Sequence, residues 1–170
     1  MTLDNAYRLL QRKDINKKVM KSLEWTKERN SEHAFDICSG QGVHSTDIEE
    51  GSEYHVDIRK KCPIGTKSLG NFHTHAHLSE SNNDAVPSSG DMMETIERDL
   101  EFVCVSGHSN DNEHATRCFH QNDIKSEINN ILGAKKWEPS EYNVRKSSRL
   151  VTKRMVKDKE YLNKMSHMKT

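Results

Sequence analysis

Apolar residues recur every three to four positions over residues 3–29, which is the period of an amphipathic helix. They are Leu3, Tyr7 and Leu10, followed by Ile15, Val19 and Leu23. Asp14 stands where a helix start can be capped, so the segment is either one helix or two short helices in series. Asn30 occupies the position of a left-handed residue that ends a helix.

Short apolar runs bounded by turn residues predict strands along the middle of the chain. The predicted strands are 32–39, 43–48, 53–58, 69–75, 101–107 and 115–121. The second and third of these are expected to form a hairpin, because a Gly-containing turn separates them. The last two are expected to pair in antiparallel fashion across a short polar loop. Gly70, inside the fourth strand, allows another group to approach its backbone closely.

Two further helices are predicted around the last strands. Ser88 stands three residues before Asp91, a spacing that resembles a helix-capping box, and a helix over about 90–99 follows it. Asp123 is expected to cap another helix, which ends at Gly133. These elements predict an α/β domain in which a mixed, mostly antiparallel sheet is flanked by helices.

The chain divides into two regions of opposite charge. Formal net charge is zero, but residues 135–170 carry 11 Lys and Arg against 4 Asp and Glu, so residues 1–134 carry the compensating negative charge. We therefore expect a domain over 1–134 and a basic C-terminal tail over 135–170. The tail is interpreted either as a solvated helix or partly disordered segment, or as a basic amphipathic helix that binds nucleic acid or a partner.

Composition narrows the class of protein further. Only 32% of residues are apolar, which predicts a thin core, and no run approaches the about 20 apolar residues of a membrane span. The N-terminus lacks the apolar segment of a secretory signal. The four cysteines are widely spaced, and we interpret them as buried reduced thiols of a cytoplasmic protein with no membrane partner. Cys104 and Cys118 are nevertheless placed to be neighbours across a strand pair.

Residues 69–91 carry the clearest candidate chemistry. His73 and His75 are two positions apart on a predicted strand, so their imidazoles point to the same side. Asp91, in the first turn of the next helix, can add a carboxylate. Two imidazoles and one carboxylate form a three-ligand set for a catalytic zinc ion with an open fourth position.

A zinc hydrolase also needs a proton carrier and a group that stabilises the oxyanion. Bound to zinc, water has a pKa near about 7, and a glutamate that does not bind the metal can take its proton. Glu32 is our candidate, because it opens a strand that can lie beside the histidine strand. Glu49 and Glu50 are alternative candidates for this base, but they lie in the predicted hairpin turn, which fits the role less well. Ser88 can donate a hydrogen bond to the oxyanion as well as cap its helix.

Glu32 opening EHAFDICSG, then NFHTHAH, then PSSGD is similar to the pattern of the JAMM/MPN+ metalloproteases. The order of elements over about residues 15–121 is similar too. The resemblance implies the MPN (JAMM, cytidine-deaminase-like) fold, with His73, His75 and Asp91 as ligands of one Zn²⁺ per chain. It implies Glu32 as general acid/base and Ser88 as the oxyanion-stabilising hydroxyl. Members cleave isopeptide or peptide bonds, often of ubiquitin-like protein conjugates.

Other readings of the same residues remain open. Ala76 stands where the family usually has proline, the 76–87 segment is longer than in most members, and His77 shares the side of the two candidate ligands. FHTHAH also resembles the first motif of PHP-type phosphoesterases, which use many more metal ligands. A further alternative is a non-catalytic MPN scaffold or a nucleic-acid-associated protein similar to RadC, which a basic tail would suit.

Overall fold

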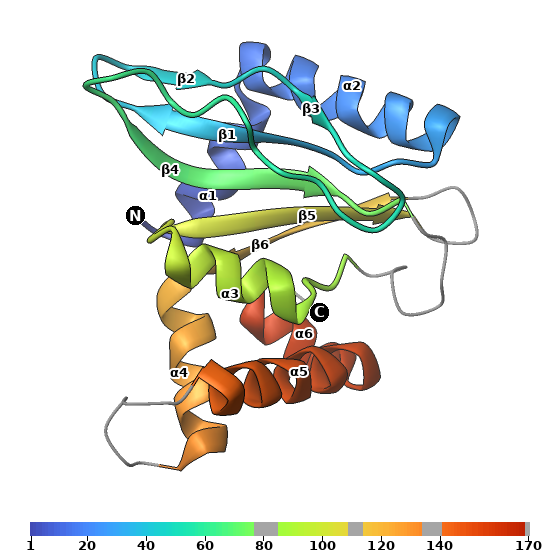
Figure 1. Cartoon of the computed structure of the whole chain (residues 1–170), viewed down its shortest axis with the longest axis vertical. Coiled ribbons are helices and arrows are strands. Elements are labelled where there is room, and N and C mark those ends of the chain that lie inside the picture. The colour runs from blue at the N-terminus through green and yellow to red at the C-terminus, as the bar shows by residue number, and fades with distance from the viewer. Residues whose placement is uncertain (77–84, 109–113, 134–140, 169–170) are drawn as a thin grey trace.

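The computed structural model describes residues 1–76, 85–108, 114–133 and 141–168. Its strands form one mixed sheet of order β2-β1-β4-β5-β6, with β3 also paired to β1 (Figure 1). The strands are β1 (His33–Ser39), β2 (Val43–Ser45), β3 (Glu49–Glu50), β4 (Lys67–Thr74), β5 (Phe102–His108) and β6 (His114–His120). Only β4 and β5 run parallel, and the other pairs are antiparallel, as the sequence predicts for an α/β protein with a mostly antiparallel sheet.

Helices cover both faces of this sheet (Figure 1). They are α1 (Leu3–Gln11), α2 (Lys13–Arg29), α3 (Ser89–Glu97), α4 (Gln121–Leu132), α5 (Glu141–Lys157) and α6 (Lys159–Met165). The two-helix interpretation of the N-terminal segment is therefore correct, and Asn30 ends α2 in the left-handed conformation with φ of 49°. Two capping predictions were wrong: no side chain caps α2, and His120 rather than Asp123 caps α4.

Two apolar clusters lie on opposite faces of the sheet, because neighbouring residues of a strand point to opposite sides. Phe102 and Cys104 of β5 pack against α1 and α2, whereas Val103 and Val105 pack against α3 to α6. Gly70 confirms the predicted close approach: a Cβ there would lie 2.4 Å from the Phe102 ring. The helices on each face are thus attached to the sheet by alternate residues of the same strands.

The prediction of a hairpin between 43–48 and 53–58 was wrong. β2 and β3 both pair with β1, and 53–58 form no strand. The Ser52 hydroxyl accepts hydrogen bonds from the backbone N–H groups of Tyr54 and His55, at 3.2 and 3.1 Å. A local turn held by this side chain therefore replaces the strand ladder that the alternating apolar residues suggested.

The C-terminal region differs from the expected separate tail. Beyond the undescribed residues 134–140 it is helical, and its apolar residues belong to the same cluster as β5, β6 and α4. Those residues are Val144, Val151, Met155, Tyr161, Leu162 and Met165. Arg117 of β6 also donates to Asn163 and Ser166 of the α6 region, at 2.8 and 3.0 Å. The interrupted apolar stripe therefore completes the core, because α5 and α6 both turn their apolar residues into this one cluster.

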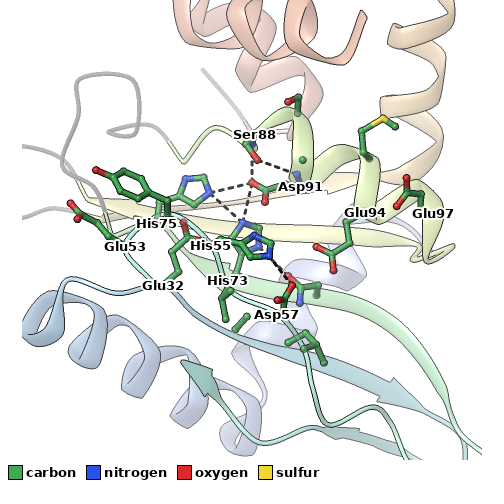
Figure 2. A pocket seen from close by; sticks show the side chains of 18 of the residues that line it. Glu32, Glu53, His55, Asp57, His73, His75, Ser88, Asp91, Glu94 and Glu97 are labelled. Atoms are coloured by element: carbon green, nitrogen blue, oxygen red, sulfur yellow. Dashed lines mark hydrogen bonds and ion pairs between the residues drawn. The ribbon is translucent and has the colours of Figure 1, made fainter. Parts of the chain in front are cut away.

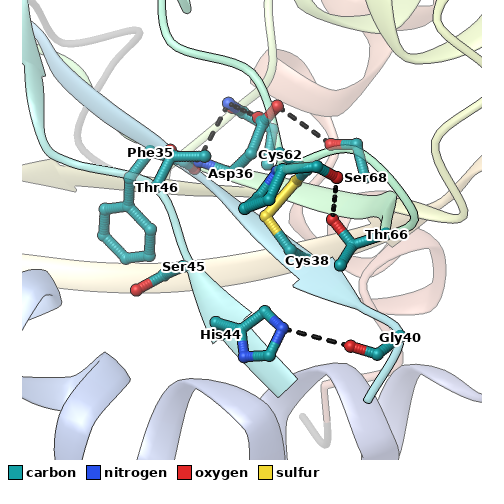
Figure 3. The surroundings of a disulfide bond; sticks show 12 residues. Phe35, Asp36, Cys38, Gly40, His44, Ser45, Thr46, Cys62, Thr66 and Ser68 are labelled. Atoms are coloured by element: carbon teal, nitrogen blue, oxygen red, sulfur yellow. Dashed lines mark hydrogen bonds between the residues drawn. A yellow bond between two sulfur atoms is a disulfide. The ribbon is translucent and has the colours of Figure 1, made fainter. Parts of the chain in front are cut away.

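The interpretation of the cysteines as reduced thiols was wrong. Cys38 is bonded to Cys62 (Figure 3), and Cys104 is bonded to Cys118. Cys104 and Cys118 are directly opposite in the β5–β6 pair, as the sequence suggested. Because disulfides persist mainly in oxidising compartments, the cysteines do not support the cytoplasmic prediction. Among the described residues, no helix has the length and apolar character to cross a membrane.

Candidate metal centre

The two histidines lie where β4 ends, on the side of the sheet that faces α3. Phe72 points into the apolar cluster beneath α1 and α2, so its neighbour His73 points to the opposite face. The backbone N–H of His75 donates to the Ser106 carbonyl at 2.8 Å, which extends the β4–β5 pairing past the last residue of β4. This extension keeps the alternation intact and places both imidazoles on one side.

The start of α3 brings the carboxylate of Asp91 to the same place. The Ser88 hydroxyl accepts from the backbone N–H of Asp91 at 3.0 Å, and the Asp91 carboxylate accepts from the backbone N–H of Ser88 at 2.8 Å. This reciprocal pair is the predicted capping box. It fixes the Asp91 side chain at the helix N-terminus, where the positive end of the helix dipole favours a carboxylate.

Three candidate ligand atoms form a nearly equilateral triangle (Figure 2). Nε2 of His73 lies 3.2 Å from Nε2 of His75, and Oδ2 of Asp91 lies 3.1 and 3.2 Å from these two nitrogens. Ligands held at 2.0–2.1 Å in tetrahedral geometry around zinc are about 3.3 Å apart. The spacing and the donor types therefore fit three protein ligands of one zinc ion.

Glu32 lies beside this triangle. In the antiparallel β1–β4 pair Ala34 is opposite His73, so the same register places Glu32 opposite His75 and on the same side of the sheet. Ligand atoms of Glu32, His73 and His75 lie within 4.8 Å of one another, and Glu32 is only 8% exposed. These three residues could hold a metal ion by themselves, and Asp91 provides a fourth candidate ligand with shorter distances to the imidazoles.

The charges of the cluster are strongly coupled. Burial lowers the pKa of His73, but the Asp91 carboxylate and its hydrogen bond outweigh burial and raise that pKa to about 9. Burial raises the pKa of Asp91, yet the two imidazoles hold it well below its usual value. Burial also raises the pKa of Glu32, and the two histidines oppose this shift to a smaller extent. Two carboxylates at a buried site thus attract positive charge, which a proton or a metal cation can supply.

The rival bases are engaged elsewhere. Glu50 pairs with Arg29 at 3.2 Å and with His33 at 3.1 Å, and Glu49 accepts from the backbone N–H of Lys60 at 3.1 Å. His77 and most of the 76–87 segment lie outside the described residues. Of the candidate bases, Glu32 therefore has the placement that the sequence predicted.

A cavity of about 470 Å³ opens over the candidate ligands. One wall is the segment 53–58, in which Nε2 of His55 lies 2.7 Å from Oδ1 of Asp57 (Figure 2). Ser88 and Glu94 line it from α3, and Arg149 reaches it from α5. Sequence reasoning missed these walls, because the first was assigned to a hairpin and the last to a separate tail.

No protein-family model, curated protein or solved structure matches this chain. The residues and their arrangement are therefore the basis for any statement about function.

Proposed function

We propose that this chain is a zinc hydrolase of JAMM type that cleaves isopeptide or peptide bonds, with ubiquitin-like protein conjugates as the expected substrates. The observation that carries the proposal is the triangle of His73, His75 and Asp91 with Glu32 beside it. The element order supports the JAMM assignment: a glutamate at the start of β1, two histidines at the end of β4, and an acid in the first turn of α3.

His73, His75 and Asp91 would hold the zinc ion, and Glu32 would remain unbound. The 3.1–3.2 Å separations suit direct ligands, and the Glu32 carboxylate lies within 4.8 Å of both imidazoles, close enough to reach a water molecule bound at the open position. When bound, zinc would supply a Lewis acid that acidifies water and polarises the scissile carbonyl.

Glu32 has the environment of a proton carrier. Its raised pKa, caused by burial, brings proton affinity closer to neutral pH than that of an exposed glutamate. It would take a proton from the attacking water and pass it to the leaving amine of the cleaved lysine or peptide bond. A carboxylate at this place can do both, because it lies beside the cavity and the candidate ligands.

Ser88 would stabilise negative charge on the carbonyl oxygen. Its oxygen already accepts the capping hydrogen bond from the backbone of Asp91, so the hydroxyl proton is not used in that bond. The residue is exposed and lines the cavity. Capping therefore orients the hydroxyl without consuming its donor, and the two roles are compatible.

The alternatives fit these observations less well. Within the described part of the chain, one group of at least three potential ligands gathers closely enough for a metal ion, whereas a PHP-type phosphoesterase needs a longer ligand series. A non-catalytic scaffold would have no use for a buried glutamate beside the ligands. A RadC-like role remains the second candidate, supported by the excess of basic residues after position 134.

The decisive experiment measures zinc content and peptidase activity in parallel. The purified protein is expected to hold one zinc ion per chain, and His73→Ala is expected to lose it. Glu32→Gln should keep the zinc and lower kcat by about 10²–10⁴-fold, because only proton transfer is removed. Glu50→Gln is the matched control and should retain activity, since Glu50 serves Arg29 and His33.

Substrate class is tested with isopeptide-linked and linear ubiquitin-like conjugates. Wild-type protein without stoichiometric zinc, or unchanged zinc content in His73→Ala, would overturn the proposal. Zinc binding together with nucleic-acid binding, but without cleavage of any conjugate, would favour the RadC-like candidate.

A further inference from the structure

A series of hydrogen-bonded polar side chains connects His73, along one face of the sheet, to the end of α3. His73 Nδ1 lies 3.0 Å from Oδ1 of Asn71, and Nδ2 of Asn71 donates to Oδ1 of Asp36 at 3.0 Å. Asp36 is fully buried and is paired with Arg98, the residue that ends α3. None of these three partners belongs to the candidate ligand set.

The hydrogen-bonding partners decide which way the Asn71 amide points. An asparagine amide carries a donor end and an acceptor end that look alike in shape, so its orientation must follow from its neighbours. The NH2 group of Asn71 faces the Asp36 carboxylate and, at 3.4 Å, the backbone carbonyl of Phe35. Both neighbours can only accept hydrogen bonds. The Phe35 group is a backbone carbonyl, and the Asp36 side chain is a carboxylate paired with the Arg98 guanidinium. The amide oxygen must therefore face His73.

That orientation selects the tautomer of His73. An amide oxygen can only accept, so Nδ1 of His73 must carry the proton that it donates to Asn71. The lone pair of the neutral ring is then on Nε2, the atom that lies 3.1 Å from Asp91 and 3.2 Å from His75. Histidine ligands of metals commonly need such an outer hydrogen bond to fix tautomer and ring orientation.

We propose that Asp36, held by Arg98, orients the Asn71 amide and thereby presents Nε2 of His73 for metal binding. This inference rests on the proposed zinc site and adds two positioning residues to it, Asn71 and Asp36. It also gives α3 a second function. Asp91 at its start lies among the candidate ligands, and Arg98 at its end determines, through Asp36 and Asn71, which ring nitrogen of His73 carries the proton.

The β1–β4 pairing explains why this arrangement is possible. Asn71 is directly opposite Asp36, two residues along each strand from the His73–Ala34 pair. Residues two apart on a strand share a side, so the chain of hydrogen bonds runs along one face of the sheet. Figure 3 shows Asp36 beside Ser68, whose hydroxyl donates to Oδ2 of the carboxylate at 2.9 Å.

The test measures the affinity of the protein for Zn²⁺ by competition with a chelator. Asp36→Asn places an amide between Asn71 and the donors Arg98 and Ser68. Its oxygen will face these donors and its NH2 group will face Asn71, which reverses the Asn71 amide and directs an N–H at His73. Zinc affinity is expected to fall about 10–100-fold, the usual effect of losing an outer-shell partner.

The exchanged pair Asp36→Asn with Asn71→Asp should recover most of that loss. It again presents an acceptor to His73 and again joins the two positions by a hydrogen bond, with the same total charge. Ser68→Ala is the matched control, because it removes another hydrogen bond to Asp36 without affecting Asn71, and zinc affinity should stay unchanged. Recovery by exchange is a result that general destabilisation of the strand pair would not produce.

The outcomes separate this inference from the proposed function. Wild-type protein that binds no zinc overturns the zinc site itself. Wild-type protein that binds zinc, together with an Asp36→Asn variant of unchanged affinity or an exchanged pair without recovery, overturns only the positioning role. If Asp36→Asn does not fold, Asn71→Leu carries the same expected loss, since it removes the acceptor of His73 and leaves the Arg98–Asp36 pair in place.

Discussion

The sheet face beneath α3 to α6 is divided into two halves of different character. On β5 and β6 it presents Val103, Val105 and Phe119, which lie buried beneath α3 to α6. On β1 and β4 the same face presents Asp36 and His73, with a cavity above them. The opposite face carries the apolar cluster beneath α1 and α2, which extends across both halves. One sheet thus combines a closed core that stabilises the fold with an open polar surface that carries the candidate site.

The largest expected effect concerns the apolar half. Phe119→Ala removes a fully buried ring, so the free energy of unfolding should fall by about 3–5 kcal/mol. Zinc stoichiometry of the folded fraction should remain at one, because none of the candidate ligands is a member of the apolar cluster that contains this ring. Urea titration and metal analysis measure the two properties. Loss of zinc in the folded variant would show that the halves are not separable.

The two disulfides allow a matched comparison of the strands that form the two halves. Cys38–Cys62 joins β1, a strand of the polar half, to the segment that follows the cavity wall 53–58 (Figure 3). Cys104–Cys118 joins β5 to β6, the strands of the closed half, and lies in the apolar cluster of the opposite face, against α1 and α2. Replacing both cysteines of either pair by alanine should lower stability by about 2–4 kcal/mol. Only the change at Cys38 and Cys62 should also raise KM, because the cavity wall loses its attachment.

Steady-state kinetics of the two double variants decides this point. Equal KM values in both variants, at a temperature where both are folded, would contradict an attachment that acts on the cavity. A rise in KM limited to the Cys104 and Cys118 replacement would place the substrate at the other half of the sheet.

The smallest effect is the pH dependence of stability in the metal-free protein. The folded pKa of His73, about 9, lies above its ordinary 6.5, so this group stabilises the fold fully below pH 6.5 and the contribution is lost as pH rises toward 9. The lowered pKa of Asp91 acts in the opposite range: its contribution is present above pH 3.8 and is lost in acid. The value of about 9 for His73 already includes the opposing effect of burial.

Thermal unfolding between pH 6 and 9 with a chelator present measures this dependence. The midpoint should decrease across the range in wild type and in Phe119→Ala, since the latter leaves the polar half intact. His73→Ala should remove the decrease. A slope that persists in His73→Ala would assign the titration to another group.

The sequence predicted most elements and the candidate site for a physical reason. Alternation along a strand and the capping box at Ser88 and Asp91 are local patterns, and both were found where expected. Glu32 was predicted to lie near the histidines from strand order, and the β1–β4 register places it opposite His75. Errors occurred where a local pattern competed with a distant partner, as at 53–58 and in the C-terminal helices.

The sequence by itself determined the residue types and their spacing: two histidines two apart, an acid in a capped first turn, and a glutamate at a strand start. Tertiary structure alone decided how these groups meet. The register of β1 against β4 places Asp36 opposite Asn71, and the packing of α3 brings Asp91 to the histidines and Arg98 to Asp36. Such contacts join residues more than 60 positions apart in the case of Arg98 and Asp36, and no local period encodes them.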